Sequence, residues 1–448
     1  MVHSIKEFLN DLRTDFNAAP TCYRDSAGGF DTSLSCPASV DVAVVGGGLL
    51  GLSTALEIAT AGRTVAVLEA GTIGSGQSMR SGGQLWPGFE ISLSALVEMF
   101  GETTAADAWR RVHDALGTVH RRAATAGGCE FRPGLLVVSK SDSQARWIEK
   151  EARLLERLGI GWGAYVGTGD LRAKHINSPL YTSALYFRGD DTGPQYGHLN
   201  PRSFTSAVAR LAGAAGAILC EQCRVTGLNR EPAGGYRLQT NSGSVKAAQV
   251  VIATGIGGIR GAGLPRAFVP VQTLILCTRP ISAELAGELI PGGACFCDAS
   301  GIAMNYGRLI EAGDGSGRFR VAFGGADALA QFQLALNVVR IRREIGAVFP
   351  QLAGIEVESA WGGQCDLSRS GVPMLLTPEA GLYCAAGFSG QGMVTTTLYA
   401  SAIAQAVTGR SREGLQTLAA LNPAPYARSG PVAKGQAAFA AFRSALSG

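Results

Sequence analysis

The feature that most constrains the fold is a glycine-rich turn between an apolar strand and a helix. A valine-rich strand at residues 41–45 runs directly into the sequence GGGLLG, in which Gly46, Gly48 and Gly51 hold the three positions of a G-x-G-x-x-G motif. A stretch with helical spacing follows, and a second valine-rich strand ends at Glu69. This order of strand, turn, helix, strand and acid predicts a βαβ unit with a parallel sheet.

Each position of the motif has a physical role in binding a dinucleotide. Gly46 allows the tight turn, Gly48 lets the backbone approach a pyrophosphate, and Gly51 lets the helix pack closely on the strand. The helix that begins near Leu49 directs its N-terminus at the phosphates. Glu69, which follows Gly46 by 23 residues, is expected to accept hydrogen bonds from the adenosine ribose. Its charge disfavours a 2′-phosphate, so NADP is not expected at this site.

Composition and charge exclude several other classes of protein. Of the 448 residues 46% are apolar and 17% are charged, as expected for a well-buried protein of more than one domain. Disorder, collagen and coiled coil are excluded because the chain has no matching repeat. The net charge of +4 is small and no basic stripe is present, so nucleic acid is not an expected partner.

The cysteines and the N-terminus predict the redox state and the location. Ten cysteines are too few for a disulfide scaffold. Cys220 and Cys223 form an isolated CxxC, and without a second knuckle or histidines at ligand spacing no metal is expected. The cysteines are therefore interpreted as buried thiols. The N-terminus lacks the apolar segment of a signal peptide, and the dinucleotide motif explains the apolar run at residues 40–62. A cytoplasmic protein without a membrane span is predicted.

A loop rich in glycine and hydroxyl groups follows Glu69 and suits a backbone that wraps closely around a ligand. Here the chain resembles the glycine/D-amino-acid oxidase (DAO) family of FAD enzymes, and within it the gamma-glutamylputrescine oxidase branch. That branch carries a motif similar to GxGASGRNGGQ at this point. This sequence matches it at Ser78, Arg80, Gly82, Gly83 and Gln84 and departs from it at Met79 and Ser81. The resemblance implies that Ser78 and Arg80 lie against the flavin diphosphate and that residues 82–84 lie beside the isoalloxazine.

Two central segments are similar to the same family. A helix is expected to begin after Asn200, with Asn200 as the N-cap and Pro201 in the first turn. Residues 220–227 are expected to form a strand, and the resemblance implies that Val225 holds the adenine through its backbone. Residues 249–255 are interpreted as the strand and turn that return to the cofactor.

A fourth motif lies near the C-terminus. Residues 387–393 read GFSGQGM and resemble the family's GFSGHGM, with Gln391 in place of the usual histidine. A helix that begins here would direct its amides at the electron-rich edge of the reduced flavin. The resemblance covers about residues 38–412. Together the motifs assign these residues to the cofactor: Gly46, Gly48, Leu49, Gly51, Glu69, Ala70, Ser78, Arg80, Gly82, Gly83, Gln84, Val225, Thr254, Gly255, Gly387, Gly390, Gln391, Gly392 and Met393.

The resemblance also predicts the domain organisation. The fold class is α/β, a two-domain flavoprotein in which a Rossmann-like FAD-binding domain is joined to an α+β substrate domain built on an antiparallel sheet. The predicted segments are 38–95, 196–262 and 355–412 for the FAD-binding domain, 96–195 and 263–354 for the substrate domain, 1–37 for an N-terminal extension and 413–448 for a C-terminal tail.

The substrate class follows from two departures from the family pattern. Amino-acid oxidases of the family bind the substrate carboxylate with a cation two or three residues after the motif histidine. The corresponding residues here, Met393 and Val394, are neutral. Two interpretations of Arg308 stay open. It either binds a substrate carboxylate from another strand or has a structural or flavin-facing role. The residues predicted to contact substrate or the reacting atoms are Gln84, Tyr306, Arg308 and Gln391.

The resemblance also bears on oxygen and on covalent attachment. Monomeric sarcosine oxidases use a lysine to promote the reaction of reduced flavin with oxygen, whereas this chain has no lysine between Lys246 and Lys434. The family's histidine attachment point falls at residues 77–79, where no histidine is present, and Cys365 is offset by about two residues from the sarcosine-oxidase cysteine. The FAD is therefore expected to be non-covalent.

The predicted activity is that of an FAD-dependent oxidase. It would convert a primary or secondary amine without a nearby carboxylate to an imine, then to an aldehyde or ketone, while oxygen is reduced to hydrogen peroxide. The expected partners are this small-molecule amine and oxygen; no oligomeric state is predicted. An FAD-dependent dehydrogenase that passes electrons to a quinone or carrier is the first alternative. A non-catalytic flavoprotein that serves in assembly is the second.

Overall fold

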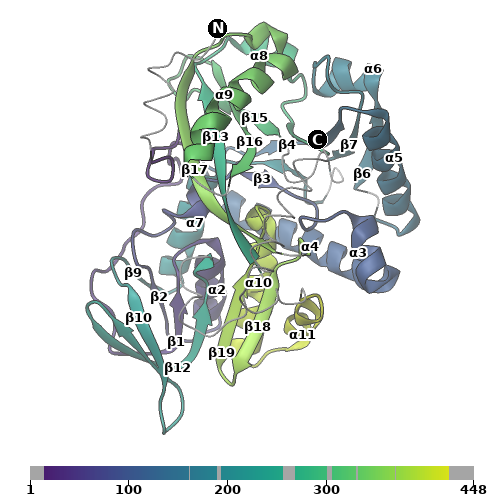
Figure 1. Ribbon diagram of the computed structural model, residues 1–448. Coiled ribbons are helices and arrows are strands. Elements are labelled where there is room, and N and C mark those ends of the chain that lie inside the picture. The colour runs from purple at the N-terminus through teal and green to yellow at the C-terminus, as the bar shows by residue number, and fades with distance from the viewer. Residues whose placement is uncertain are drawn as a thin grey trace.

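The computed structural model places most of the chain in two large sheets with helices packed against them (Figure 1). The structure describes residues 15–160, 162–188, 193–255, 268–299, 305–328, 331–368 and 370–422. Both the parallel sheet and the antiparallel sheet expected from the sequence are present, so the predicted mixed α/β fold is confirmed.

The first sheet contains the predicted βαβ unit. Its parallel strands are β1 (Ser39–Val45), β2 (Val65–Leu68), β9 (Ile218–Cys220), β12 (Gly243–Ile252) and β19 (Leu382–Ala386). Three antiparallel strands extend it: β10 (Val225–Arg230), β11 (Tyr236–Thr240) and β18 (Met374–Glu379). Val42 pairs with Val65 on one side and with Gln249 on the other. The valine runs are fully buried here, as is typical of the centre of a parallel sheet.

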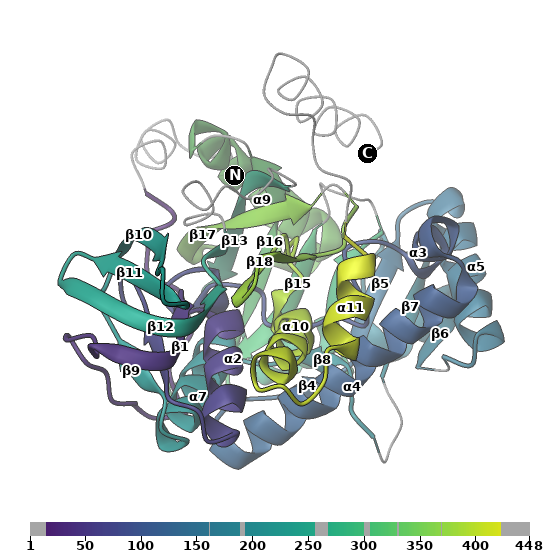
Figure 2. The same ribbon diagram turned by 90° about the horizontal axis from the view of Figure 1, so that it is seen from below.

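Four helices pack together beside this sheet: α2 (Leu49–Thr60), α4 (Glu102–Ala126), α7 (Pro201–Ala214) and α10 (Gly392–Val407). Helix α2 packs against β1 and β2 and lies between α7 and α10 (Figure 2). The expected N-cap is confirmed, because the Asn200 side chain accepts hydrogen bonds from the amides of Arg202 and Ser203. An ion pair of 2.9 Å between Arg122 Nη2 and Glu57 Oε1 joins α4 to α2.

The second sheet is the antiparallel sheet expected for substrate binding. Its strands run in the order β17 (Val357–Ser368), β13 (Phe268–Thr278), β16 (Phe319–Ala328), β15 (Tyr306–Glu311), β14 (Cys295–Asp298), β5 (Leu135–Ser139), β7 (Ser183–Phe187) and β6 (Gly163–Gly167). All neighbours are antiparallel except β14 and β5. Helix α9 (Gln331–Val348) packs on β13 and β16, and α5 (Asp142–Arg157) packs on β5, β6 and β7. Helices α3 (Leu93–Phe100) and α8 (Ala283–Leu289) complete this part.

A small sheet connects the two large ones. It consists of β3 (Gln84–Leu85), β8 (Gly197–His198) and β4 (Arg132–Pro133). The remaining short elements are η1 (Gln77–Met79), α6 (Thr168–Asp170), η2 (Leu171–His175), η6 (Pro350–Leu352) and α11 (Glu413–Ala420). Strand β17, within the segment 355–412 that the sequence assigned to the FAD-binding domain, pairs along its length with β13. The division into domains stays a prediction.

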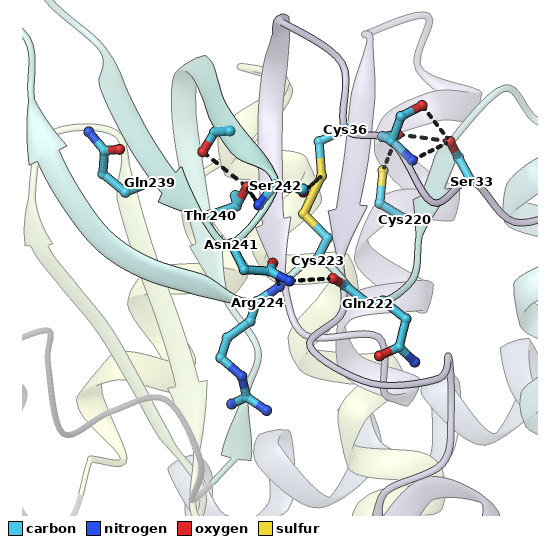
Figure 3. Close-up of a disulfide and its surroundings, with 12 residues drawn as sticks. Ser33, Cys36, Cys220, Gln222, Cys223, Arg224, Gln239, Thr240, Asn241 and Ser242 are labelled. Atoms are coloured by element: carbon cyan, nitrogen blue, oxygen red, sulfur yellow. Dashed lines mark hydrogen bonds between the residues drawn. A yellow bond between two sulfur atoms is a disulfide. The ribbon is translucent and has the colours of Figure 1, made fainter.

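Two expectations from the sequence are wrong in the region of Cys223. Cys36 and Cys223 are joined by an S–S bond of 2.20 Å (Figure 3), so the interpretation of all ten cysteines as thiols is wrong at these two positions. The strand expected over residues 220–227 is also wrong. Strand β9 ends at Cys220, and β10 begins only at Val225 after a turn in which Gln222 has a φ of +52°. The partner Cys36 lies 187 residues away, and only the folded chain brings it to this turn.

Candidate functional site

A cavity of about 750 Å³ lies at the carboxyl ends of β1 and β2, beside the N-termini of α2 and α10. We refer to it as the groove. Most of the residues predicted to hold a cofactor line it: Gly46, Gly48, Leu49, Glu69, Ala70, Ser78, Arg80, Val225, Thr254, Gly255, Gly390, Gly392 and Met393. The predicted residues outside its lining are Gly51, Gly82, Gly83, Gln84, Gly387 and Gln391. The groove therefore joins segments from all four sequence motifs.

The glycine turn at one end of the groove has two kinds of glycine. Gly46 has a φ of +109°, and a Cβ on it would lie 2.5 Å from the carbonyl oxygen of Ala253. A Cβ on Gly51 would lie 2.0 Å from the carbonyl oxygen of Gly46. Both positions therefore require glycine for the fold itself. Gly48 differs, because its nearest neighbour would be Ser78 Oγ at 3.0 Å, and its backbone faces the groove.

Hydrogen bonds fix the polar groups at this end. Glu69 Oε2 accepts a hydrogen bond from the Gly47 amide at 2.7 Å, and Oε1 accepts one from the Gly71 amide at 2.8 Å. A carboxylate has about four acceptor sites, so Glu69 keeps lone pairs for ribose hydroxyls in the groove. Ser78 Oγ accepts from the Leu49 amide at 2.9 Å, which ties the second glycine-rich loop to the N-terminus of α2.

At the other end of the groove, the loop before α10 is shaped by Asp366. The buried Asp366 carboxylate accepts a hydrogen bond of 2.6 Å from the Gly387 amide. Burial raises the pKa of Asp366 to about 6, although backbone amides of the loop counteract this effect. Helix α10 itself has no side-chain cap. Its first amides, at Gly392 and Met393, are therefore left for a ligand at the groove wall.

These features fit an FAD molecule. Thr254 Oγ1 is a buried hydroxyl without a hydrogen-bond partner among the described residues, and Thr254 lines the groove. A ligand atom would satisfy it. Phosphates would bind at the two helix N-termini and at the open backbone of Gly48, and the ribose would bind to the fixed Glu69 carboxylate. The sequence motifs missed further lining residues, namely Asn17, Gln77, Arg224, Gly363, Cys365, Asp366 and Thr396.

Arg80 lines the groove, but backbone carbonyls hold its guanidinium. Nε donates to Gly362 O at 2.8 Å, and Nη2 donates to Phe16 O at 2.7 Å. Gln77 on the same loop donates from Nε2 to Cys365 Sγ at 3.0 Å. The loop is therefore anchored to β17, and the contact of Arg80 with a diphosphate stays a prediction.

Residues 82–84 turn from the groove toward the second sheet. A Cβ on Gly82 would lie 3.2 Å from the Tyr306 ring, and one on Gly83 would lie 3.3 Å from Arg308 Nη1. Gln84 Nε2 donates to Phe296 O at 3.0 Å. The structure thus brings Gln84, Tyr306 and Arg308 together behind this loop, and none of the three lines the groove.

Arg308 is engaged in the interior. It is 3% exposed, and its Nη1 donates to Leu199 O at 2.7 Å and contacts His198 Nδ1 at 2.9 Å. Burial, and secondarily the Arg308 charge, hold the pKa of His198 well below its usual range, so a neutral imidazole accepts at Nδ1. The guanidinium also lies over the Tyr23 ring, 5.2 Å from its centroid. This setting supports a structural role for Arg308.

Gln391 is placed differently from the expectation. Its side-chain amide donates to the Glu90 carboxylate instead of pointing into the groove. Burial raises the pKa of Glu90 to about 7, and the hydrogen bond from Gln391 acts in the opposite direction. Glu90 lines a second, smaller cavity of about 190 Å³. No sequence motif includes Glu90, so this contact could not be predicted from the sequence.

Comparison with known proteins identifies the class of protein. The family model described as "FAD dependent oxidoreductase", DAO, matches residues 41–406. The chain therefore belongs to the DAO family of FAD-dependent oxidoreductases, an enzyme family whose cofactor is FAD.

Individual relatives are similar over most of their length. The gamma-glutamylputrescine oxidoreductase of Escherichia coli is 30% identical over 391 residues, which cover 85% of this chain and 86% of that protein. The probable oxidoreductase OrdL of Haemophilus influenzae is 27% identical, covering 82% of this chain and 83% of the relative. The crystal structure of glycine oxidase from Geobacillus kaustophilus superposes with a TM-score of 0.65 at 22% identity, covering 84% of this chain and 96% of that chain. The last comparison supports the fold.

The described residues contain neither a membrane-spanning helix nor a cluster of metal-binding side chains. None of the described helices has the length and apolar character needed to cross a membrane. Within the same residues, histidine, cysteine and acidic side chains form no group of three or more suited to a metal ion.

Proposed function

We propose that the protein is an FAD-dependent oxidase of primary or secondary amines that lack a nearby carboxylate. The observation that carries this proposal is the environment of Gln391, the residue in the position of the family's motif histidine. Its side chain is paired with the Glu90 carboxylate. Met393 and Val394, at the positions where a family cation would bind a substrate carboxylate, are buried and neutral.

The charges at this corner favour an amine over an amino acid. The ionised form of Glu90 would repel a substrate carboxylate near Gln391, whereas an ammonium group would favour that form and be attracted to it. Arg308, the alternative carboxylate ligand, is held by Leu199 and His198 away from the groove lining. The E. coli relative is named for gamma-glutamylputrescine, which supports an amine as substrate.

The chain's own residues bind and orient, while bound FAD supplies the hydride acceptor. The uncapped amides of Gly392 and Met393 provide partial positive charge where negative charge develops on reduction. The buried Met393 and the partly buried Phe388 form an apolar wall of the groove, which excludes water from the reacting carbon. The products are an imine and, with oxygen as acceptor, hydrogen peroxide.

Anaerobic mixing of the holoenzyme with a panel of amines and amino acids tests the proposal. We expect carboxylate-free amines to reduce the flavin, and kcat/KM for sarcosine, glycine and D-alanine to be about one to two orders of magnitude lower, because a charge-assisted hydrogen bond of about 1.5–3 kcal/mol is missing. A higher kcat/KM for sarcosine or D-alanine than for every carboxylate-free amine would contradict the substrate class. Flavin reduction without subsequent oxygen consumption would indicate a dehydrogenase instead.

A further inference from the structure

The second cavity lies outside the groove, between the antiparallel sheet and helices α3, α4 and α5. Helix α5 packs on β5, β6 and β7 of this sheet, and α3 packs on α4 and α5. We refer to this cavity as the acidic pocket. Its volume is about 190 Å³. None of its lining residues lines the groove. The two cavities approach each other at the Gln391–Glu90 hydrogen bond, since Gly390 and Gly392 line the groove and Glu90 lines the pocket.

Aromatic rings form much of the wall of the acidic pocket. The rings belong to Trp86, Phe89, Trp109, Trp147 and Phe187. Trp86 Nε1 donates to Phe89 O at 3.0 Å, which fixes the loop that carries both residues. The same loop approaches Trp109 so closely that a Cβ on Gly88 would lie 2.6 Å from the indole ring. A rigid wall of this kind suits aliphatic carbons, and tryptophan faces attract cations.

Three carboxylates line the same pocket: Glu90, Glu151 and Asp298. Asp298 is paired with Lys140 Nζ at 2.7 Å. Glu151, which is 3% exposed, accepts hydrogen bonds from the Ser94 amide in the first turn of α3. Among the described residues, neither Glu90 nor Glu151 forms an ion pair. When ionised, Glu90 and Glu151 therefore give the pocket negative charge that no direct ion pair with a described residue balances, although the charge of Lys150 acts on Glu151.

Burial makes this charge costly. It raises the pKa of Glu151 as well as that of Glu90, since a carboxylate removed from water is stabilised by its proton. The pocket also holds an unpaired donor. Trp109 Nε1 is buried and meets no acceptor among the described residues. An uncharged hydroxyl group is thus the competing occupant, but it would satisfy Trp109 without compensating the carboxylates.

We propose that the acidic pocket binds the non-reacting end of the substrate, a positively charged nitrogen at the end of an aliphatic chain. This inference rests on the proposed function, which places the reacting nitrogen in the groove. Glu90 is then the counter-ion nearest the groove, Glu151 adds negative charge deeper in the pocket, and the tryptophans enclose the methylene groups. The substrate class is narrowed to diamines and related amines with a second cationic nitrogen.

The first experiment compares three substrates with the same four-carbon chain on the holoenzyme: putrescine, n-butylamine and 4-amino-1-butanol. We expect kcat/KM for putrescine to exceed that for n-butylamine by about tenfold or more, as a charge-assisted contact provides. In Glu90→Gln this ratio should fall toward one. Glu156→Gln changes an exposed acid on α5 and should leave the ratio unaltered. FAD content and melting temperature verify that each variant is folded.

The second experiment measures binding without turnover. Butyltrimethylammonium has no nitrogen lone pair and serves as a calorimetric probe of the holoenzyme. Its Kd should rise about tenfold in Glu90→Gln, rise also in Trp147→Leu, and stay unchanged in Glu156→Gln. If no amine reduces the flavin but this Glu90-dependent binding is present, the proposed oxidase function fails and the pocket assignment stands.

Three results would overturn the pocket assignment while amine oxidation itself is observed. They are equal kcat/KM for putrescine and n-butylamine, a putrescine preference that survives in Glu90→Gln, and a preference for aminobutanol over putrescine. The last result would show that the pocket binds a neutral substrate hydroxyl, which accepts a hydrogen bond from Trp109 Nε1.

Discussion

The groove and the acidic pocket are built in opposite ways. The groove is made largely of backbone: glycines, helix N-termini and amides that leave room for a large ligand. The pocket is made of large side chains, and its charged groups are carboxylates. The groove therefore suits an anionic diphosphate, whereas the pocket suits a cation.

The difference also separates the property that FAD-binding members of the family share, the cofactor site, from the pocket proposed here to set the substrate preference of this protein. The groove is lined by segments of all four family motifs, and any member that binds FAD needs such a site. The pocket is lined from the loop at residues 86–92 and from α3, α4, α5, β5, β7 and the end of β14. Substitutions in the two cavities should accordingly affect different measurements, cofactor content in one and substrate preference in the other.

The largest effect is expected for Gly51→Val. A Cβ at this position would lie 2.0 Å from the carbonyl oxygen of Gly46, so α2 must move away from β1. We expect the purified protein to contain almost no FAD and to melt at a lower temperature. Gly213→Ala on α7, where a Cβ meets open space, is the control. Retention of stoichiometric FAD in Gly51→Val would contradict the close approach.

Gly48→Ala should affect the ligand and not the fold. Gly48 has a φ of −81°, which alanine adopts readily, and the nearest atom to the new Cβ is Ser78 Oγ at 3.0 Å. We expect the melting temperature of the apoprotein to stay close to that of the parent, while the affinity for FAD falls by about tenfold or more because the pyrophosphate approach is filled. If Gly48→Ala lost apoprotein stability to the same extent as FAD affinity, Gly48 would serve the fold in the same way as Gly51.

Gln391→Leu tests the contact between the two cavities. Removing the amide deprives Glu90 of its hydrogen bond and raises the pKa of Glu90 above about 7. We expect the putrescine preference at neutral pH to fall about fivefold, which corresponds to one hydrogen bond of about 1 kcal/mol, with FAD content unchanged. Gln405→Leu, at an exposed position of the same helix, should change neither quantity. Loss of FAD in Gln391→Leu would instead favour the flavin contact expected from the sequence.

The smallest effect is a pH-dependent change in stability in Glu90→Gln. The folded-state pKa of Glu90 is raised to about 7, above the unfolded value of about 4.3. Between these values the folded state binds more protons, so this residue lowers stability as pH rises. The variant should therefore melt about 1–3 °C higher than the parent at pH 8, with the difference disappearing toward pH 4.

The other titratable groups near Glu90 do not reverse the direction in which stability changes with pH. Cys297 on β14 stays a neutral thiol because burial holds its pKa well above the usual range. Glu151 and the Lys140–Asp298 pair are present in both proteins. A melting-temperature difference that is the same at pH 5 and pH 8 would show that Glu90 is not the titrating group.

The sequence predicted the elements that depend on local pattern. The βαβ unit and the helix after Asn200 lie where valine runs and an N-cap indicated them. It was wrong over residues 220–227, where a turn between β9 and β10 contains Cys223, which is joined to Cys36 by a disulfide. Local pattern carries no information about a partner 187 residues away.

The features of the candidate site likewise fall into those set by local sequence and those set by the tertiary structure. By itself the sequence determined that the chain has a dinucleotide groove, because the βαβ motif is continuous in sequence and the glycine at position 51 is required by backbone sterics within that unit. Only the tertiary structure decided that Gln391 bonds to Glu90, that Asp366 shapes the loop before α10, and that Arg308 is buried against His198. The reason is physical: the charge and the pKa of a side chain depend on which distant segments enclose it, and no spacing within one segment specifies that enclosure.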